Sequence, residues 1–334
     1  MRERDGGIVA AGITRRDWLS ATAASLGVAA SVRADEPQLS SDEAQSRDDV
    51  LARAKEVGIG RLKLRVTKRF FALSDAPDVF TTQALDICEN LLTDYLEYFQ
   101  TRKFAIHPPE RRLTLVILST PKEQLKFLGD DDPEGEAEPV FDPDANRLVF
   151  FDLRAGGARF RANRERGNTV TLCHETSLLL FENTGLLHPD ADVPDSIRDG
   201  FADFLENRPP TGRWAAGKPN AGKLARLSGQ RTVPWISVER LLGDDKAFED
   251  AATIRDAEAE SWVLVDLLIR SPARLPGFLR YLEAINARRE PGHRLADARA
   301  HLGDLDTLDK EVQAMVGTWR TFYEKLLETQ KPSR

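Results

Sequence analysis

The sequence has few cysteines and no long apolar run. Cys88 and Cys173 are the only two cysteines among 334 residues, too few for a disulfide framework. They form either a single bridge or two buried thiols. The apolar segment from Ala21 to Val32 holds twelve residues, whereas a helix that spans a bilayer needs about 20. We therefore expect no membrane span in the mature chain.

An excess of positive charge is also missing. The chain carries 47 Lys and Arg against 54 Asp and Glu, which gives a formal net charge of −7 at pH 7. A protein that binds nucleic acid through its phosphates needs a basic surface. The acidic balance therefore disfavours nucleic acid as a partner.

The first 34 residues have the layout of a twin-arginine export signal. Thr14-Arg15-Arg16-Asp17-Trp18-Leu19 precedes the mild apolar run, and cleavage after Ala34 fits the small residues that end it. An amphipathic N-terminal helix is the alternative interpretation. Removal of residues 1–34 takes away five basic and three acidic side chains, so the net charge becomes −9. The pattern predicts a location in the periplasm or cell envelope.

Residues 35–58 are acidic and polar, and we predict that they form a disordered tether before a domain at residues 59–330. Leu62, Leu64 and Val66 alternate with polar residues, which predicts a strand that Phe70 and Phe71 extend. A helical stripe follows, formed by Leu85, Cys88, Leu92, Tyr95 and Phe99. Further strands are predicted at 113–118 and 147–152, with a surface loop at 130–139 between them.

The second half of the chain is predicted to be mainly helical. Its amphipathic stripes cover residues 169–183, 196–206, 257–270, 275–287 and 305–330. Residues 207–223 contain prolines, glycines and basic side chains and are predicted to form an exposed connection. Strands followed by helices indicate an α+β fold, with a β-rich subdomain at 59–167 and a helical subdomain at 168–330 that share one cleft.

The segment His174-Glu175-Thr176-Ser177-Leu178 is most suggestive of chemistry. In an H-E-x-x-H helix, two histidines one turn apart bind zinc, and the glutamate takes a proton from the metal-bound water. Here leucine stands in place of the second histidine. An H-E pair alone is a weak signal, so the residues that follow decide its meaning.

Those residues are Asn183-Thr184-Gly185-Leu186-Leu187 and the stretch from Pro194 to Glu206. The pattern resembles a family of bacterial proteins of unknown function in the gluzincin-like peptidase MA clan. Members read approximately H-E-x-x-H-Q-L-x-F-N-T-G-L, then P-x-x-I/L-x-E-G-x-A-x-Y/F-x-E. Glu260-Ser261-Trp262-Val263-Leu264-Val265 is similar to a later helix of the family, and residues 308–327 to its closing helix. The similarity covers roughly residues 60–328 and is most specific at 169–206. It implies a metallopeptidase-like fold.

The resemblance also implies roles for four positions. His174 corresponds to the first zinc ligand, Glu175 to the general base, Leu178 to the second ligand and Asp199 to the third. Leucine cannot bind a metal, and aspartate is one methylene shorter than the family's glutamate, so at most two of three protein ligands remain. We expect no cofactor, and His174, Glu175 and Asp199 become a vestigial polar group in which carboxylates favour a protonated imidazole.

Other residues either complete the zinc site or have no part in it. His188 or Glu182 could supply a missing ligand, in which case zinc would bind. Cys173 lies beside His174 in sequence but about 100° away around a helix, which favours a buried thiol over a Cys-His pair. Trp262 and Phe204 are predicted to be core residues, and His107, His293 and His301 surface residues.

The sequence therefore predicts an exported metallopeptidase-like protein without peptidase activity. Its inherited cleft would hold an extended peptide or an envelope protein. The alternatives are an active zinc metallopeptidase with an atypical ligand set and a purely structural envelope protein.

Overall fold

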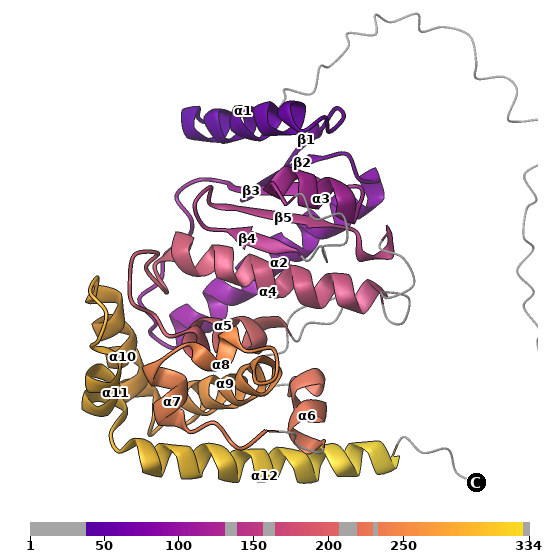
Figure 1. Ribbon diagram of the computed structural model, residues 1–334. Helices are drawn as coiled ribbons and strands as arrows, with labels where there is room; N and C mark the ends of the chain where they lie inside the picture. The colour runs from indigo at the N-terminus through magenta and orange to yellow at the C-terminus, as the bar shows by residue number, and fades with distance from the viewer. Residues whose placement is uncertain (1–37, 131–138, 156–163, 207–218, 230–232, 330–334) are drawn as a thin grey trace, which may run out of the picture. The chain divides into compact units, whose positions relative to one another are not determined.

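The computed structural model describes residues 38–130, 139–155, 164–206, 219–229 and 233–329 (Figure 1). The predicted export signal at 1–34 and nearly all of the predicted loop at 130–139 lie outside these ranges. From Leu39 onward the chain forms one compact unit. Among the described residues, no helix is both long enough and apolar enough to cross a membrane.

A five-stranded sheet forms in the first half of the described chain, in the order β1-β2-β3-β5-β4. Strands β2, β3 and β5 run parallel, and β1 and β4 pair antiparallel at the two edges. The bounds are β1 Lys63–Val66, β2 Phe70–Ser74, β3 Leu113–Leu118, β4 Val140–Asp142 and β5 Arg147–Phe151. The predicted strands at 113–118 and 147–152 are confirmed, the second ending one residue early.

The prediction that Phe70 and Phe71 extend the first strand is wrong. They begin β2, which folds back so that Val66 of β1 lies opposite Phe71. The Thr67 backbone N–H donates to the Phe70 carbonyl at 2.8 Å and closes the turn between the strands. The physical reason is burial, because every residue of β2 is buried whereas β1 alternates between exposed and half-buried residues.

Helices cover both faces of the sheet (Figure 1). Phe70 and Ala72 of β2 face a core shared with α2 and α4, and Phe71 and Leu73 face a core shared with α1 and α3. This alternation is the period of two expected of a strand buried on both faces. The helices of the first half are α1 Ser41–Glu56, α2 Asp78–Thr101 and α3 Pro121–Leu128, with a 3-10 turn at Leu153–Ala155. The predicted helical stripe lies within α2.

The predicted disordered tether is contradicted over most of its length, because Ser41–Glu56 form helix α1. Ser40 and Glu43 form a capping box at its start. Val50 and Ala54, one turn apart, are buried against the sheet, and the Glu43 carboxylate accepts a 2.9 Å hydrogen bond from the Arg112 guanidinium. The polar composition of residues 41–56 did not predict this helix. Two apolar residues and one ion pair are enough to hold it against the sheet.

The second half is helical, as predicted. Its helices are α4 Arg164–Thr184, α5 Asp195–Glu206, α6 Ala221–Ser228, α7 Val238–Gly243, α8 Lys246–Glu249, α9 Ile254–Arg270, α10 Leu275–Ala287, α11 Arg294–Leu302 and α12 Leu305–Thr329. The five predicted stripes correspond to α4, α5, α9, α10 and α12. Trp262 and Phe204 are buried, which confirms them as core residues. The described structure is thus α+β, with a small mixed sheet and a mainly helical remainder.

Helix α5 packs against both α4 and α9. Its contact with α9 is close at Gly200, where an added Cβ would lie 2.7 Å from the Ser261 carbonyl oxygen and from Cγ2 of Val265. Backbone oxygen cannot move aside as a flexible side chain can. Gly200 therefore sets how near α5 comes to α9, and with it the position of the residues that α5 turns toward α4.

Gly200→Ala is expected to push α5 away from α9 and to lower the free energy of unfolding by about 1–3 kcal/mol, the usual cost of overpacking. Gly317→Ala is the control, because it lies within α12 and an added Cβ there meets nothing within 4 Å. That change should stabilise the protein by about 0.5–1 kcal/mol. Urea unfolding measures both, and equal stability of Gly200→Ala and wild type would contradict the close approach.

Candidate functional site

Helices α4 and α5 carry the candidate residues. His174, Glu175 and Leu178 lie on α4, and Asp199 lies on α5. Two further acidic residues follow Asp199 at steps of four and three, Asp203 and Glu206. This helical spacing places all three carboxyl groups on one side of α5.

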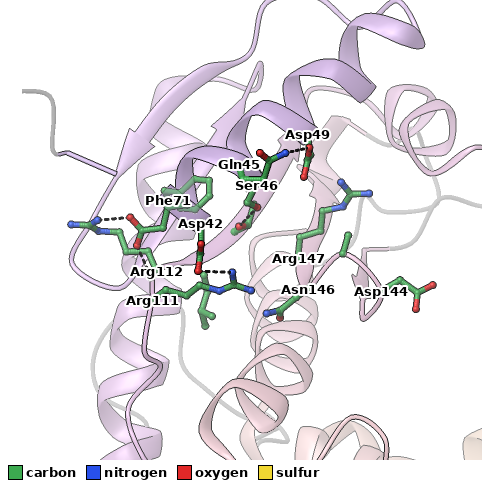
Figure 2. Close-up of a pocket in the computed structure, with 14 residues that line it drawn as sticks. Asp42, Gln45, Ser46, Asp49, Phe71, Arg111, Arg112, Asp144, Asn146 and Arg147 are labelled. Atoms are coloured by element: carbon green, nitrogen blue, oxygen red, sulfur yellow. Dashed lines mark hydrogen bonds and ion pairs between the residues drawn. The ribbon is translucent and has the colours of Figure 1, made fainter. Parts of the chain in front are cut away.

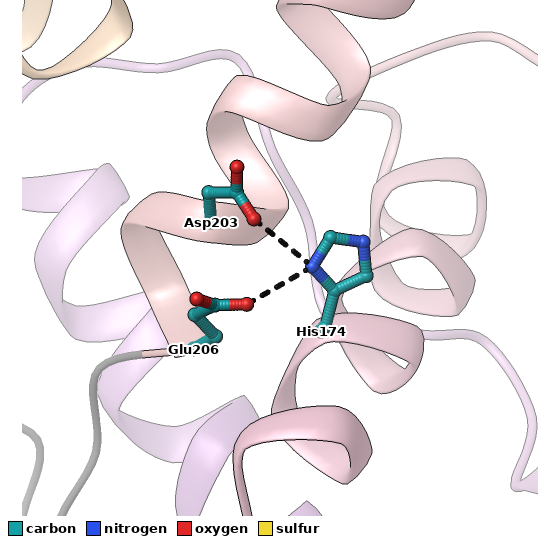
Figure 3. Close-up of side chains that lie close together, drawn as sticks. All are labelled: His174, Asp203 and Glu206. Atoms are coloured by element: carbon teal, nitrogen blue, oxygen red, sulfur yellow. Dashed lines mark hydrogen bonds and ion pairs between the residues drawn. The ribbon is translucent and has the colours of Figure 1, made fainter. Parts of the chain in front are cut away.

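One nitrogen of the His174 ring points toward both Asp203 and Glu206 (Figure 3). Its Nδ1 atom is 3.3 Å from Asp203 Oδ1 and 3.3 Å from Glu206 Oε2. The other ring nitrogen, Nε2, faces away from both carboxylates (Figure 3). In the described chain, these residues form the one group of three His, Cys, Asp or Glu side chains whose donor atoms all lie within 4.8 Å of one another. We call these three residues the His174 cluster.

The helix after α5 completes the surroundings of the His174 cluster. Lys223 Nζ on α6 is 2.8 Å from Asp203 Oδ2 and 2.8 Å from Glu258 Oε2 on α9. Asn220 Nδ2 donates to Glu206 Oε1 at 2.6 Å and to the Asp203 carbonyl at 3.2 Å. In each carboxylate, one oxygen therefore faces His174. The other oxygen of Asp203 faces Lys223 on α6, and the other oxygen of Glu206 faces Asn220, the residue that caps α6.

The prediction of an exposed connection at 207–223 is therefore wrong at its C-terminal end, and residues 207–218 lie outside the described ranges. Asn220 is only 5 % exposed. Its side chain caps α6 by accepting from the Gly222 and Lys223 N–H groups. An asparagine before a helical segment is a recognisable N-cap signal, and it could have indicated α6.

Burial and charge shift the pKa values of the His174 cluster. Burial lowers the pKa of His174, but its polar contacts with Asp203 and Glu206 and the charges of Asp203 and Glu175 raise it well above its usual value. Burial and the charge of Glu206 raise the pKa of Asp203, and after the opposing effects of Lys223 and His174 it is about 6. For Glu206, burial acts upward, but His174 and Lys223 lower the pKa overall. The arrangement favours an imidazolium held between carboxylates.

The other predicted site residues lie outside the His174 cluster. The Glu175 carboxylate accepts a 2.9 Å hydrogen bond from the Phe141 backbone N–H on edge strand β4. Leu178 is partly buried and packs against the main hydrophobic core. Asp199 is half-buried, and burial raises its pKa to about 7. The carboxylates that contact His174 are thus Asp203 and Glu206, whereas the sequence had suggested Glu175 and Asp199.

Neither predicted substitute ligand joins the His174 cluster. Glu182 follows His174 by eight residues, which is about 12 Å along a helix. His188 lies beyond α4, where its N–H donates to Asn286 Oδ1 at 2.9 Å, and 43 % of its side chain is exposed. Cys88 and Cys173 are buried and form no disulfide bond, which settles the two alternatives in favour of thiols.

A separate cavity of about 320 Å³ lies between α1, the start of β3 and the β4–β5 turn (Figure 2). Its charged groups pair mostly with one another or with neighbours. Arg112 pairs with Glu43, and Arg147 Nη2 lies 2.9 Å from Asp142. None of its lining residues belongs to the His174 cluster.

Comparison with known proteins adds no identity. No protein-family model matches the sequence, and no curated protein matches it. The functional interpretation therefore rests on the residues of α4, α5 and α6 and on their geometry.

Asp199→Asn is expected to change how stability depends on pH. The folded pKa of about 7 lies above the ordinary 3.8, so the folded chain binds a proton that the unfolded chain releases as pH rises above about 4. Wild-type stability should therefore fall between about pH 4 and 7. We expect the variant to be as stable as wild type at pH 4 and about 2 kcal/mol more stable at pH 8, with the partial exposure of Asp199 taken into account.

Thermal unfolding at the two pH values measures this difference. The exposed Asp306→Asn on α12 is the control and should give the same difference from wild type at both. A pH-independent effect of Asp199→Asn would show that the pKa of this carboxyl group is the same in the folded and unfolded chain.

Proposed function

We propose that this chain is an exported, metallopeptidase-like protein that does not cleave peptides and instead binds an extended peptide or a partner protein. The observation that carries the proposal is the combination of Leu178 at the second-ligand position with a His174 ring engaged by Asp203 and Glu206. The resemblance of the 169–206 segment to gluzincin-like proteins supplies the class.

Loss of peptidase activity follows from the ligand positions. Catalytic zinc sites use three protein ligands and keep a fourth position for water. Of the three positions that the resemblance assigns, Leu178 offers no donor atom, and Asp199 is not among the atoms that converge with His174. The inherited residues therefore do not fit a catalytic zinc ion, and we derive no hydrolytic step from them.

The position of Glu175 supports the same conclusion. A general base must reach the water that it activates. In this structure the Glu175 carboxylate holds the N–H of Phe141. Its role here is to tie edge strand β4 to α4, which connects the sheet to the helical half.

A charged network accounts for the retained architecture without a catalytic metal. His174, Lys223, Asp203 and Glu258 come from four different helices, α4, α6, α5 and α9. Such a buried network fixes the relative position of the helices, because breaking any pair leaves a charge unpaired away from water. It takes the place that zinc has as the link between α4 and α5.

Edge strand β4 supports binding of an extended peptide. It pairs with β5 on one side only among the described strands. Extended peptides commonly add to such an edge through main-chain hydrogen bonds. In this chain the peptide would replace Glu175 as the acceptor for the Phe141 N–H, so Glu175 would respond to peptide binding without taking part in hydrolysis.

A second candidate function, an active metallopeptidase with an atypical ligand set, is favoured by one observation. Three donor atoms do converge, one each from His174, Asp203 and Glu206, and none of them belongs to the predicted His188 or Glu182. This function requires Glu175 to leave Phe141 and act as the base.

Peptide cleavage distinguishes the two functions. The purified mature chain should cleave unstructured peptides no faster than buffer, with or without a chelator. Chelator-sensitive turnover that Glu175→Gln abolishes would refute the proposed function and establish the second. The control is Glu182→Gln, a carboxyl group on the same helix outside the His174 cluster.

Restoring the family positions tests the resemblance itself. Leu178→His with Asp199→Glu returns two ligands, so we expect zinc to bind at least tenfold more tightly than to wild type, because each added ligand contributes to affinity. Competition with a chromophoric chelator measures the difference. Unchanged affinity would mean that position 178 does not face the inherited zinc position.

Export is part of the proposal and rests on the motif Arg15-Arg16, which lies outside the described residues. Replacing both arginines by lysine should keep the full-length protein in the cytoplasm, because the receptor reads this pair. Cell fractionation of wild type and variant measures the effect. Equal export of the two would contradict the twin-arginine route.

A further inference from the structure

We propose that His174, Asp203 and Glu206 form a binding site for one divalent first-row transition-metal ion, about one turn farther along α5 than the inherited third-ligand position. The site deepens the proposed function by naming a cofactor for the same region. The proposed site rests on the proposed function only in that it lies beside the inherited ligand positions. A metal ion bound there need not support peptide cleavage.

The first argument is the spacing of the donor atoms. A charge-assisted N–H···O⁻ hydrogen bond is about 2.7–2.9 Å long, and the single hydrogen on Nδ1 cannot point at two acceptors at once. Both contacts of His174 Nδ1 are 3.3 Å long. Atoms that each lie about 2.1 Å from one ion are separated by about 3.0 Å at a right angle and about 3.4 Å at the tetrahedral angle. The contact with Glu206 is a long hydrogen bond, the contact with Asp203 is equally long, and both separations also fit ligands of one ion.

The second argument is the state of Asp203. Its side chain is wholly buried, yet among the described residues neither carboxylate oxygen has a contact that meets full hydrogen-bond geometry. Lys223 compensates the charge of Oδ2 at 2.8 Å, while Oδ1 faces only the shared imidazole nitrogen. Buried carboxylate oxygens are normally satisfied by hydrogen bonds or by metal ions. A cation between Oδ1, Nδ1 and Glu206 Oε2 would satisfy all three atoms.

The third argument is the support around the donors. Metal-binding carboxylates are usually oriented by a hydrogen bond or charge on their other oxygen. Asn220 donates to Glu206 Oε1, which leaves Oε2 to face His174. Lys223 contacts Asp203 Oδ2, which leaves Oδ1 to face His174. One side of the set remains accessible, since 20 % of the His174 side chain is exposed.

The donor set indicates the class of ion. An imidazole nitrogen with two carboxylate oxygens suits Mn²⁺, Fe²⁺, Co²⁺ or Zn²⁺. Mg²⁺ and Ca²⁺ prefer sites made of oxygen atoms alone. Selectivity against these two ions therefore separates the proposed site from a general attraction of cations to acidic side chains.

The experiment uses the mature chain after dialysis against a chelator. Isothermal titration with Mn²⁺ and with Zn²⁺ should show one site per chain, and Co²⁺ should give visible absorption bands of a nitrogen- and oxygen-coordinated ion. Asp203→Asn and Glu206→Gln should each abolish the site or weaken it more than 100-fold. Asn220→Ala should weaken it about 10- to 100-fold, the usual effect of losing an orienting partner. Glu182→Gln is the control and should bind as wild type.

Circular dichroism shows which variants fold. If Asp203→Asn fails to fold, Glu206→Gln and the wild-type Co²⁺ spectrum still decide the matter. The proposal is overturned by the absence of a site for these ions in wild type, by equal binding of Mg²⁺ or Ca²⁺, or by binding that Glu206→Gln leaves unchanged. Peptide turnover by wild type would overturn the proposed function and not the metal site, whereas lack of metal would do the reverse.

Discussion

The burial of Asp203 is the constraint on which the arrangement of the helices depends. An ionised carboxylate costs several kcal/mol to remove from water unless opposite charges or hydrogen bonds compensate it. In this protein the compensation comes from α4 through His174 and from α6 through Lys223. The α4, α5 and α6 helices must therefore stay in register with one another for the folded state to be favourable. On the side of α5 that faces α9, Gly200 allows the two helices to approach closely, which holds α5 in this position.

The same constraint bears on the proposed function, in which a metallopeptidase-like scaffold has lost a zinc ligand. Under that proposal an inherited zinc ion would join two helices, and Leu178 would remove one of its bonds. Here the joining contacts lie farther along α5, between His174, Asp203 and Glu206. Leu178 adds to the hydrophobic core instead. Whether a proton or a transition-metal ion sits on His174 Nδ1, the link between the helices runs through this nitrogen.

Glu175, which the proposed resemblance places at the position of the general base, connects the sheet and the helical half. Glu175 holds edge strand β4 through Phe141, and the parallel strands behind it are covered on both faces. The region around His174 is therefore bordered by a strand edge and by an imidazole side chain that is 20 % exposed. Under the proposed function, those two features would serve the recognition of an extended chain.

The long helices were predictable because apolar residues recur every three or four positions over many turns, and α4, α5, α9, α10 and α12 all show this. Short helices such as α7 and α8 span too few turns for the pattern to appear. Helix α1 was missed because only Val50 and Ala54 carry its packing, and the rest of its sequence is that of a solvated segment. The chain reverses direction before Phe70 because β2 is buried on both faces of the sheet. The sequence of one strand does not show which other elements will cover it.

The sequence by itself determined that position 178 cannot bind a metal, that His174 stands on an amphipathic helix, and that Asp199, Asp203 and Glu206 share one side of another. Which of those three carboxylates meets His174 was decided only in the tertiary structure. Helical periodicity specifies the face of a helix but not the point along its axis where a neighbour crosses. That point is set by the close approach of α5 to α9 and by the cation Lys223, which the next helix, α6, brings to Asp203.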